Sequence, residues 1–408
     1  MKYPQKTTAL LIIFILSIPN IQNSFAAERK SYNQIHNEGK NFVRESTKNL
    51  NDIQSNIRKI NKLLSSNISS KDKIILEKQR KELNDLYKKQ KAEIDRANIY
   101  INDMENNKER ILKVESEINA IDKRRKNLDK MYKIGRFRIF YSLKGRDSLP
   151  STRRIDNNND KVPDYIQNIA LQLVHAEEYY TKVLGLTHPF KQPPYVNKNL
   201  KFIDVNIVRS PLDPIKKMIK GKAWNKAINL KRNNFSKVTS NSLMIDISSD
   251  FDLTYGVPSH ELFHLFQYGY TQFFSPWFVE GTAVWAQNHF GGVEYSEWKV
   301  PKNKQQLLSQ KYESSRFWSE LCKRVDKYGV IIPKKLTKYN YIGSNTKIVP
   351  NKTVKCARFM RKFLTELKKI EVSVTKEKDL VPYSWTSEAI YSPDNEQYIW
   401  QALRNSME

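Results

Sequence analysis

Cysteine, acidic residues and long hydrophobic runs are scarce in this sequence, and each shortage narrows the possible classes of protein. Cys322 and Cys356 are the only cysteines among 408 residues. Neither lies near the N-terminus, which argues against a lipoprotein anchored through that end. In an oxidising compartment the two thiols could pair, but the sequence does not show how far apart they lie in space.

The shortage of acidic residues leaves the chain strongly basic. Lys and Arg number 70 against 43 Asp and Glu, so the formal net charge is +27 and the isoelectric point is near 9.7. Such a charge attracts anionic partners, and an anionic surface polymer is the partner we expect. The alternative is that the lysines only keep exposed helices soluble. No nucleic-acid-binding motif is visible, so we expect no specific nucleic-acid partner.

The longest apolar run lies at the N-terminus and is typical of a secretory signal peptide. Lys2 and Lys6 precede the apolar residues 9–16, and small residues, Ser24 and Ala26, stand at positions −3 and −1 of a cleavage site. The run is too short for a comfortable membrane span, although an uncleaved anchor is the alternative. We therefore expect residues 1–26 to be removed and the mature protein to be secreted or periplasmic.

Glycine and proline are absent between Lys40 and Ile134, which favours long, unbroken helices. Two sets of apolar residues there follow the three-four spacing of a coiled coil. They are Val43, Leu50, Ile53, Ile57, Ile60 and Leu64, then Leu76, Leu83, Tyr87, Ile94, Ala97, Ile101, Met104, Ile111 and Ile118. A turn over residues 65–70 separates the sets, and Ser69 or Ser70 can cap the second helix.

Residues 27–131 are therefore expected to form an antiparallel helical hairpin, with a longer second helix that could be broken. Its apolar stripe is narrow and buries little within one hairpin. The stripe needs a partner, either a second copy of the chain in a homo-oligomer or the remainder of the same chain.

The pattern changes near residue 132 to one that predicts an α+β fold. Residues 136–143, 201–208 and 243–248 alternate as strands do, and residues 163–184 read as a helix. The basic residues 216–237 read as a loop. We expect a catalytic domain over residues 132–303, completed by a mainly helical part over residues 304–408. We expect the core of that last part to contain four large apolar residues, Tyr312, Phe317, Trp318 and Leu321.

The most informative stretch is residues 260–264, with the sequence HELFH. His260 and His264 lie four residues apart, so a helix presents both on one face, where they can bind one metal ion. Glu261 lies one step round the helix and is free to act as a base. This pattern is typical of zinc hydrolases. The chain has only six histidines, and the apolar residues around these two already supply the buried surface of the helix.

A third metal ligand is required, and Glu280 is the best candidate. It lies in a second apolar segment that also reads as a helix, and a turn at Ser275 and Pro276 would fold this segment back against the first. Fifteen residues separate His264 from Glu280. His289 and Glu294 are the alternative ligands.

Together HELFH and the downstream residues 277–286, WFVEGTAVWA, resemble the zincin metallopeptidases of the gluzincin type. Residues 156–165, DNNNDKVPDY, are similar to an element of a group of secreted bacterial metallopeptidase-like proteins. The resemblance covers about residues 135–329. It implies a zincin-like domain in which His260, His264 and Glu280 bind Zn²⁺ and Glu261 is the catalytic base, acting on protein or peptide substrates.

The same resemblance makes residues 244–248 a candidate edge strand for pairing with substrate. A donor to the developing oxyanion is also needed, and the candidates are Tyr312, Tyr268 and His289.

Residues 156–167 have the spacing of a calcium-binding loop. Asp156, Asn158, Asp160 and Asp164 stand at positions 1, 3, 5 and 9. Lys161 occupies position 6, where glycine is preferred, and Gln167 occupies position 12, where glutamate is preferred. Two interpretations therefore stay open, a Ca²⁺ site and an Asn/Asp turn that leads into a helix.

A different class of function is a non-catalytic, basic coiled-coil protein that binds or attaches to an anionic surface, with zinc structural or absent. The intact HELFH with Glu280 favours the enzyme, because a binding module has no use for a base beside an open metal position.

Overall fold

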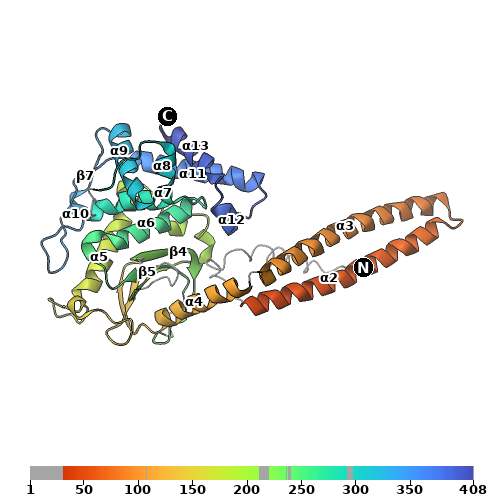
Figure 1. The fold of residues 1–408 in the computed structure, drawn as a ribbon, viewed down its shortest axis with the longest axis horizontal. Coiled ribbons are helices and arrows are strands. Elements are labelled where there is room, and N and C mark those ends of the chain that lie inside the picture. Colours follow the sequence, from red (N-terminus) through yellow and green to blue (C-terminus); the bar gives the residue numbers. More distant parts are fainter. Residues whose placement is uncertain are drawn as a thin grey trace. The chain divides into compact units, whose positions relative to one another are not determined.

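The computed structural model describes residues 31–106, 108–210, 220–235, 237, 240–291 and 297–407. These residues mix helices and strands and form two compact units, residues 31–118 and 119–407 (Figure 1). The expected signal peptide, residues 1–26, lies outside the described residues. Within the described ranges, no helix is long and apolar enough to cross a membrane.

The first unit contains the two long helices expected from the sequence, α2 (Tyr32–Leu64) and α3 (Ser70–Asn106), followed by the start of α4 (Lys108–Lys126). The Gln90 side chain donates to the Ser46 carbonyl, and His36 contacts Glu105, so the two helices run antiparallel. Ser69 caps α3 by accepting a hydrogen bond from the Asp72 amide at 3.2 Å.

The apolar stripe of the hairpin faces inward between the two helices. The buried residues of α2 recur every seven positions, at Tyr32, Gly39, Ser46 and Ile53. Opposite them Ile94, Ile101 and Met104 are buried in α3. The hairpin thus covers part of its own stripe, as heptad packing requires. A homo-oligomer through these helices stays a prediction.

The second unit is built on a five-stranded sheet with the order β1-β2-β3-β5-β4. Its strands are β1 (Lys130–Ile134), β2 (Phe137–Tyr141), β3 (Phe202–Val208), β4 (Gly221–Ile228) and β5 (Ser242–Ser248). Strands β2, β3 and β5 are parallel, whereas β1 and β4 are antiparallel to their neighbours. The three strands predicted from alternating residues are confirmed as β2, β3 and β5.

The sequence did not reveal the two outer strands. We expected the helical region to continue to residue 131, but α4 ends at Lys126 and strand β1 begins at Lys130. The loop predicted over residues 216–237 is wrong for its described part, which contains β4. Residues 221–228 have the sequence GKAWNKAI, and an outer strand tolerates such lysines because one of its edges is not paired within the sheet.

The prediction that residues 244–248 form the sheet edge is also wrong. They belong to β5, which pairs with both β3 and β4. Strand β4 is the outer strand on that side of the sheet among the described residues.

Two helices, α5 (Asp164–Glu178) and α6 (Val257–Tyr270), cover one face of the sheet (Figure 1). The predicted helix over residues 163–184 is confirmed as α5 and the π-helical turn that follows it (Tyr179–Val183). Ile203, Val205, Ile245 and Ile247 point into the core between sheet and helices and are fully buried. Burial of this kind is the main favourable contribution to the stability of the fold.

Residues 304–407 are mainly helical, as expected, and pack onto the same unit. Their helices and short strands are α8 (Lys304–Leu308), α9 (Ser315–Val325), β6 (Val330–Ile331), α10 (Lys334–Thr337), β7 (Thr353–Val354), α11 (Ala357–Glu377), α12 (Ser387–Ile390) and α13 (Asn395–Met407). Cys322 and Cys356 form a disulfide that joins α9 to the residue before α11. The pairing that the sequence left open is therefore made.

The other face of the sheet carries a buried network of charged side chains centred on Asp246. Its carboxylate accepts hydrogen bonds from Arg125, from Asn206 at 2.9 Å and from the Trp224 indole at 2.8 Å. Asp246 and Arg125 are both fully buried. The network therefore joins the last turn of α4 to the middle of β4 and β5.

Replacing Asp246 by Asn should destabilise the protein, because the buried Arg125 would keep only Asp122 as a carboxylate partner. We expect the free energy of unfolding to fall by about 3 kcal/mol. In the control Asp394→Asn, the lost carboxylate is 71% exposed and 3.9 Å from Lys378, so the change should stay below about 0.5 kcal/mol. Denaturant unfolding of the three proteins measures both values. A loss below about 1 kcal/mol for Asp246→Asn would contradict this role of the network.

Candidate metal centre

The HELFH residues lie in the first half of α6. Gly256 precedes the helix with a positive φ of 66°, and Pro258 occupies its first turn. Leu262, Phe263, Leu265 and Phe266 are fully buried in the core. This packing fixes the rotation of the helix, and the face that carries His260 and His264 is thereby turned toward α7.

Helix α7 (Pro276–Gln287) folds back on α6 and carries Glu280. The helix begins at Pro276, and Ser275 before it is extended. The predicted turn at these two residues is therefore wrong, and the linker over residues 271–275 makes the reversal. Glu396 of α13 accepts hydrogen bonds from the Ser275 hydroxyl and the Trp277 indole. The C-terminal helices thus hold the linker that sets the position of α7.

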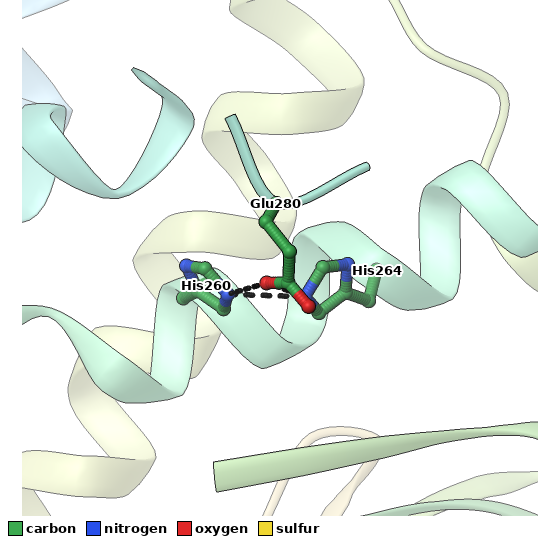
Figure 2. A group of neighbouring side chains, drawn as sticks. All are labelled: His260, His264 and Glu280. Atoms are coloured by element: carbon green, nitrogen blue, oxygen red, sulfur yellow. Dashed lines mark hydrogen bonds and ion pairs between the residues drawn. The ribbon is translucent and has the colours of Figure 1, made fainter. Parts of the chain in front are cut away.

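The two histidines and Glu280 converge on one point between the helices (Figure 2). The distance between His260 Nε2 and His264 Nε2 is 3.0 Å. Glu280 Oε2 lies 3.3 Å from the first nitrogen and 3.4 Å from the second. Among the described residues, these three form the only group of three or more His, Cys, Asp or Glu side chains whose ligand atoms lie within 4.8 Å of one another.

These distances fit a zinc ion. Zinc binds imidazole nitrogen and carboxylate oxygen at about 2.0–2.2 Å with tetrahedral geometry, which places its ligand atoms about 3.3 Å from one another. Two imidazole nitrogens and one carboxylate are also the donor set of a catalytic zinc site, which leaves a fourth position for water or substrate.

Two glutamine side chains, which the sequence analysis did not single out, orient the histidines. Gln267 donates its amide hydrogens to the Val279 carbonyl and the Thr282 hydroxyl, at 2.9 and 2.7 Å. Its oxygen therefore faces His264 Nδ1, 2.7 Å away.

Gln287 acts on the other histidine in the same way. It donates to the Tyr255 carbonyl and accepts from His260 Nδ1 at 2.8 Å. In the neutral form of both histidines the proton therefore lies on Nδ1, and the Nε2 lone pair can bind a metal ion at the point where the ligand atoms meet.

The charged forms of His264 and Glu280 stabilise each other. Burial alone would lower the pKa of His264, but the nearby Glu280 carboxylate raises it to about 9. Burial would raise the pKa of Glu280, but the two histidines lower it well below its usual range. A cation at this point is therefore stabilised by Glu280, whether the cation is a proton or a metal ion.

Glu261 stands beside the cluster and is not one of its three ligand residues. Burial raises the pKa of its carboxyl, against the opposing effect of the two histidines, and the Ala223 amide donates a hydrogen bond to it. Gly221 lies so close that a Cβ at this position would overlap the Glu261 carboxylate. Strand β4 therefore shapes the space in which Glu261 lies.

A cavity of about 330 Å³ opens beside the cluster. Residues 221–225 of β4 line it, together with Glu261, His264 and Glu280.

Tyr268 and Tyr312, two of the three candidate oxyanion donors, line the same cavity. Tyr268 stacks on the His264 ring, and the Tyr312 ring lies 6.0 Å from that of His260. Burial, followed by the carboxylates of Glu280 and Glu261, raises the pKa of both tyrosines, so both keep their phenolic proton at neutral pH.

His289, the third candidate, does not lie in the cluster. Its ring packs between Tyr179 and Trp285, with centroids 5.3 Å from each, and burial lowers its pKa to about 4. His289 is therefore not brought to the metal ligands, as oxyanion donor or as third ligand. Glu294, the other alternative ligand, lies outside the described residues.

The candidate calcium loop forms a series of Asx turns. Asp156 accepts hydrogen bonds from the amides of Asp160 and Lys161, and Asp160 accepts from the amide of Val162. Asp164 begins α5 and accepts from Asn157. These contacts are those of the predicted Asn/Asp turn that leads into a helix. Calcium binding stays a prediction.

No protein-family model, curated protein or solved structure matches this chain. The functional assignment therefore depends on the geometry of the site itself.

Proposed function

We propose that the protein is an exported, zinc-dependent peptidase of the zincin type. The observation that carries the proposal is the convergence of His260, His264 and Glu280 at distances that fit a tetrahedral zinc shell, with Glu261 beside them. The open cavity on the same side supplies room for a substrate. A purely structural zinc site would be closed by a fourth protein ligand.

The roles of the side chains follow from their chemistry. His260, His264 and Glu280 would hold Zn²⁺, which acidifies a water molecule and polarises a carbonyl group when bound. Glu261 would accept the proton of the attacking water and deliver it to the leaving amine. Tyr268 and Tyr312, which keep their protons, would be the donors to the developing oxyanion.

The position of strand β4 favours a peptide as the substrate. It is the outer strand on its side of the sheet, and residues 221–225 line the cavity beside Glu261. An extended peptide could add to this strand through main-chain hydrogen bonds, which recognise any sequence. The role expected for residues 244–248 is thereby proposed for β4.

The proposal is tested by metal analysis and a hydrolysis assay on the mature protein. We expect about one zinc ion per chain. A chelator should remove both the zinc and the hydrolysis of casein and of fluorogenic peptides, and added Zn²⁺ should restore both. A protein that holds zinc and cleaves none of these substrates would instead support the non-catalytic, surface-binding alternative.

A further inference from the structure

The cavity beside the metal centre continues into a wall of large uncharged side chains. Tyr268, Phe274, Phe278, Ile390 and Tyr391 line it. Tyr268 connects this wall to the metal centre because its ring stacks on that of His264, with centroids 5.9 Å apart. The wall and the metal ligands thus share one continuous space.

The wall is assembled from two distant parts of the chain. Phe274 belongs to the linker between α6 and α7, whereas Ile390 is the last residue of α12 and Tyr391 follows it. The Phe274 and Tyr391 rings pack edge to face, with centroids 4.8 Å apart. The Phe274 amide donates to the Ile390 carbonyl, which also accepts from Asn395 at 2.9 Å. These hydrogen bonds fix the C-terminal segment against the linker.

The outer part of the wall is apolar surface in contact with water. Tyr391 is 52% exposed and Phe278, deeper in the wall, is fully buried. An apolar group that enters the cavity would remove this surface from water, whereas a charged group would lose hydration and would find no opposite charge among these five side chains.

We propose that this wall is the pocket for one substrate side chain and that it selects a bulky apolar residue, such as Phe or Leu, near the scissile bond. The pocket gives the C-terminal segment a direct role in substrate recognition. This inference rests on the proposed peptidase function, because it takes the occupant to be a peptide.

Peptide binding tests the pocket separately from catalysis. The full-length mature Glu261→Gln protein, loaded with zinc, is titrated by calorimetry with short Gly/Ser peptides that carry a single central Phe, Leu, Ala or Asp. The Phe and Leu peptides should bind at least about tenfold more tightly than the Ala peptide, and the Asp peptide should bind no better than Ala.

Added to this background, Tyr391→Ala should remove most of the preference for Phe and leave the binding of the Ala peptide within about twofold. Tyr391→Phe should keep the preference. Tyr328→Ala, which removes a tyrosine that is 84% exposed and does not line the cavity, is the matched control and should change nothing.

Equal binding of the four peptides, or a preference for Phe that survives Tyr391→Ala and Phe274→Ala, would overturn the pocket. Hydrolysis of the same peptides by the unmodified protein is measured in parallel. A preference in binding without hydrolysis supports the pocket and refutes the peptidase. Hydrolysis without a preference in binding supports the peptidase and refutes the pocket.

Discussion

Glu261→Gln is expected to lower the rate of peptide hydrolysis by about 10²–10⁴-fold while the zinc content stays unchanged. The reason is that Glu261 lies next to His260 in the sequence but is not one of the three residues whose ligand atoms converge. Glutamine has the same shape and can still accept the hydrogen bond from the Ala223 amide. Because glutamine has the volume of glutamate, it also fits in the narrow space between position 261 and Gly221. What it lacks is the ability to take and return a proton.

The measurement is kcat on a fluorogenic peptide together with zinc content on the same sample. Glu320→Gln is the matched control, since Glu320 pairs with Lys323 on the surface of α9 and should affect neither value. Loss of zinc from Glu261→Gln, with activity falling only in proportion to occupancy, would show that Glu261 is a ligand. Unchanged activity at full occupancy would show that another group is the base.

The two histidines of the metal cluster could be predicted from the sequence because the pattern that reveals them spans only five consecutive residues. His260 and His264 need only one helical turn to share a face, and the apolar residues around them fix that helix against the core. The heptads of α2 and α3 are local in the same sense, and their inward-facing residues include the predicted Ile53, Ile94, Ile101 and Met104.

The parts that the sequence analysis missed depend on contacts between distant residues. The sequence of β4 reads as a basic loop because lysine and asparagine occur both in exposed loops and in outer strands such as this one. The amide of Gln287 reaches His260 only after α7 has folded back on α6. Gln267 was the exception, because it follows His264 by three residues on the same face of α6, and this spacing could have drawn attention to it.

The C-terminal residues carry no motif of their own, and their contribution emerges only in the folded chain. Glu396 holds the start of α7, and Tyr391 pairs with Phe274 at the cavity. The disulfide between Cys322 and Cys356 anchors α9 to the residue before α11. A region that reads as generic helix thus positions both the third ligand and the cavity wall.

The second large effect is expected on zinc affinity when the third ligand, Glu280, is replaced. Glu280→Ala should weaken zinc binding by about two to three orders of magnitude, because four-ligand zinc sites bind with about 10–16 kcal/mol and one ligand in four contributes about 2.5–4 kcal/mol. The fold should persist, since Glu280 contributes its carboxylate to the cluster and is partly exposed, with 22% of its side chain accessible.

Zinc affinity is measured by competition with a chromophoric chelator, and circular dichroism checks that the variant is folded. Glu280→Gln keeps the volume and should also weaken binding, because a neutral amide is a poorer zinc ligand than a carboxylate. Glu320→Ala is the control for the loss of a surface carboxylate and should leave the affinity unchanged. If folded Glu280→Ala retained zinc against the chelator as well as the unmodified protein does, Glu280 would not be the ligand. Because the ring of His289 is packed between Tyr179 and Trp285, the replacement would then have to be sought outside the described residues, with Glu294 as the first candidate.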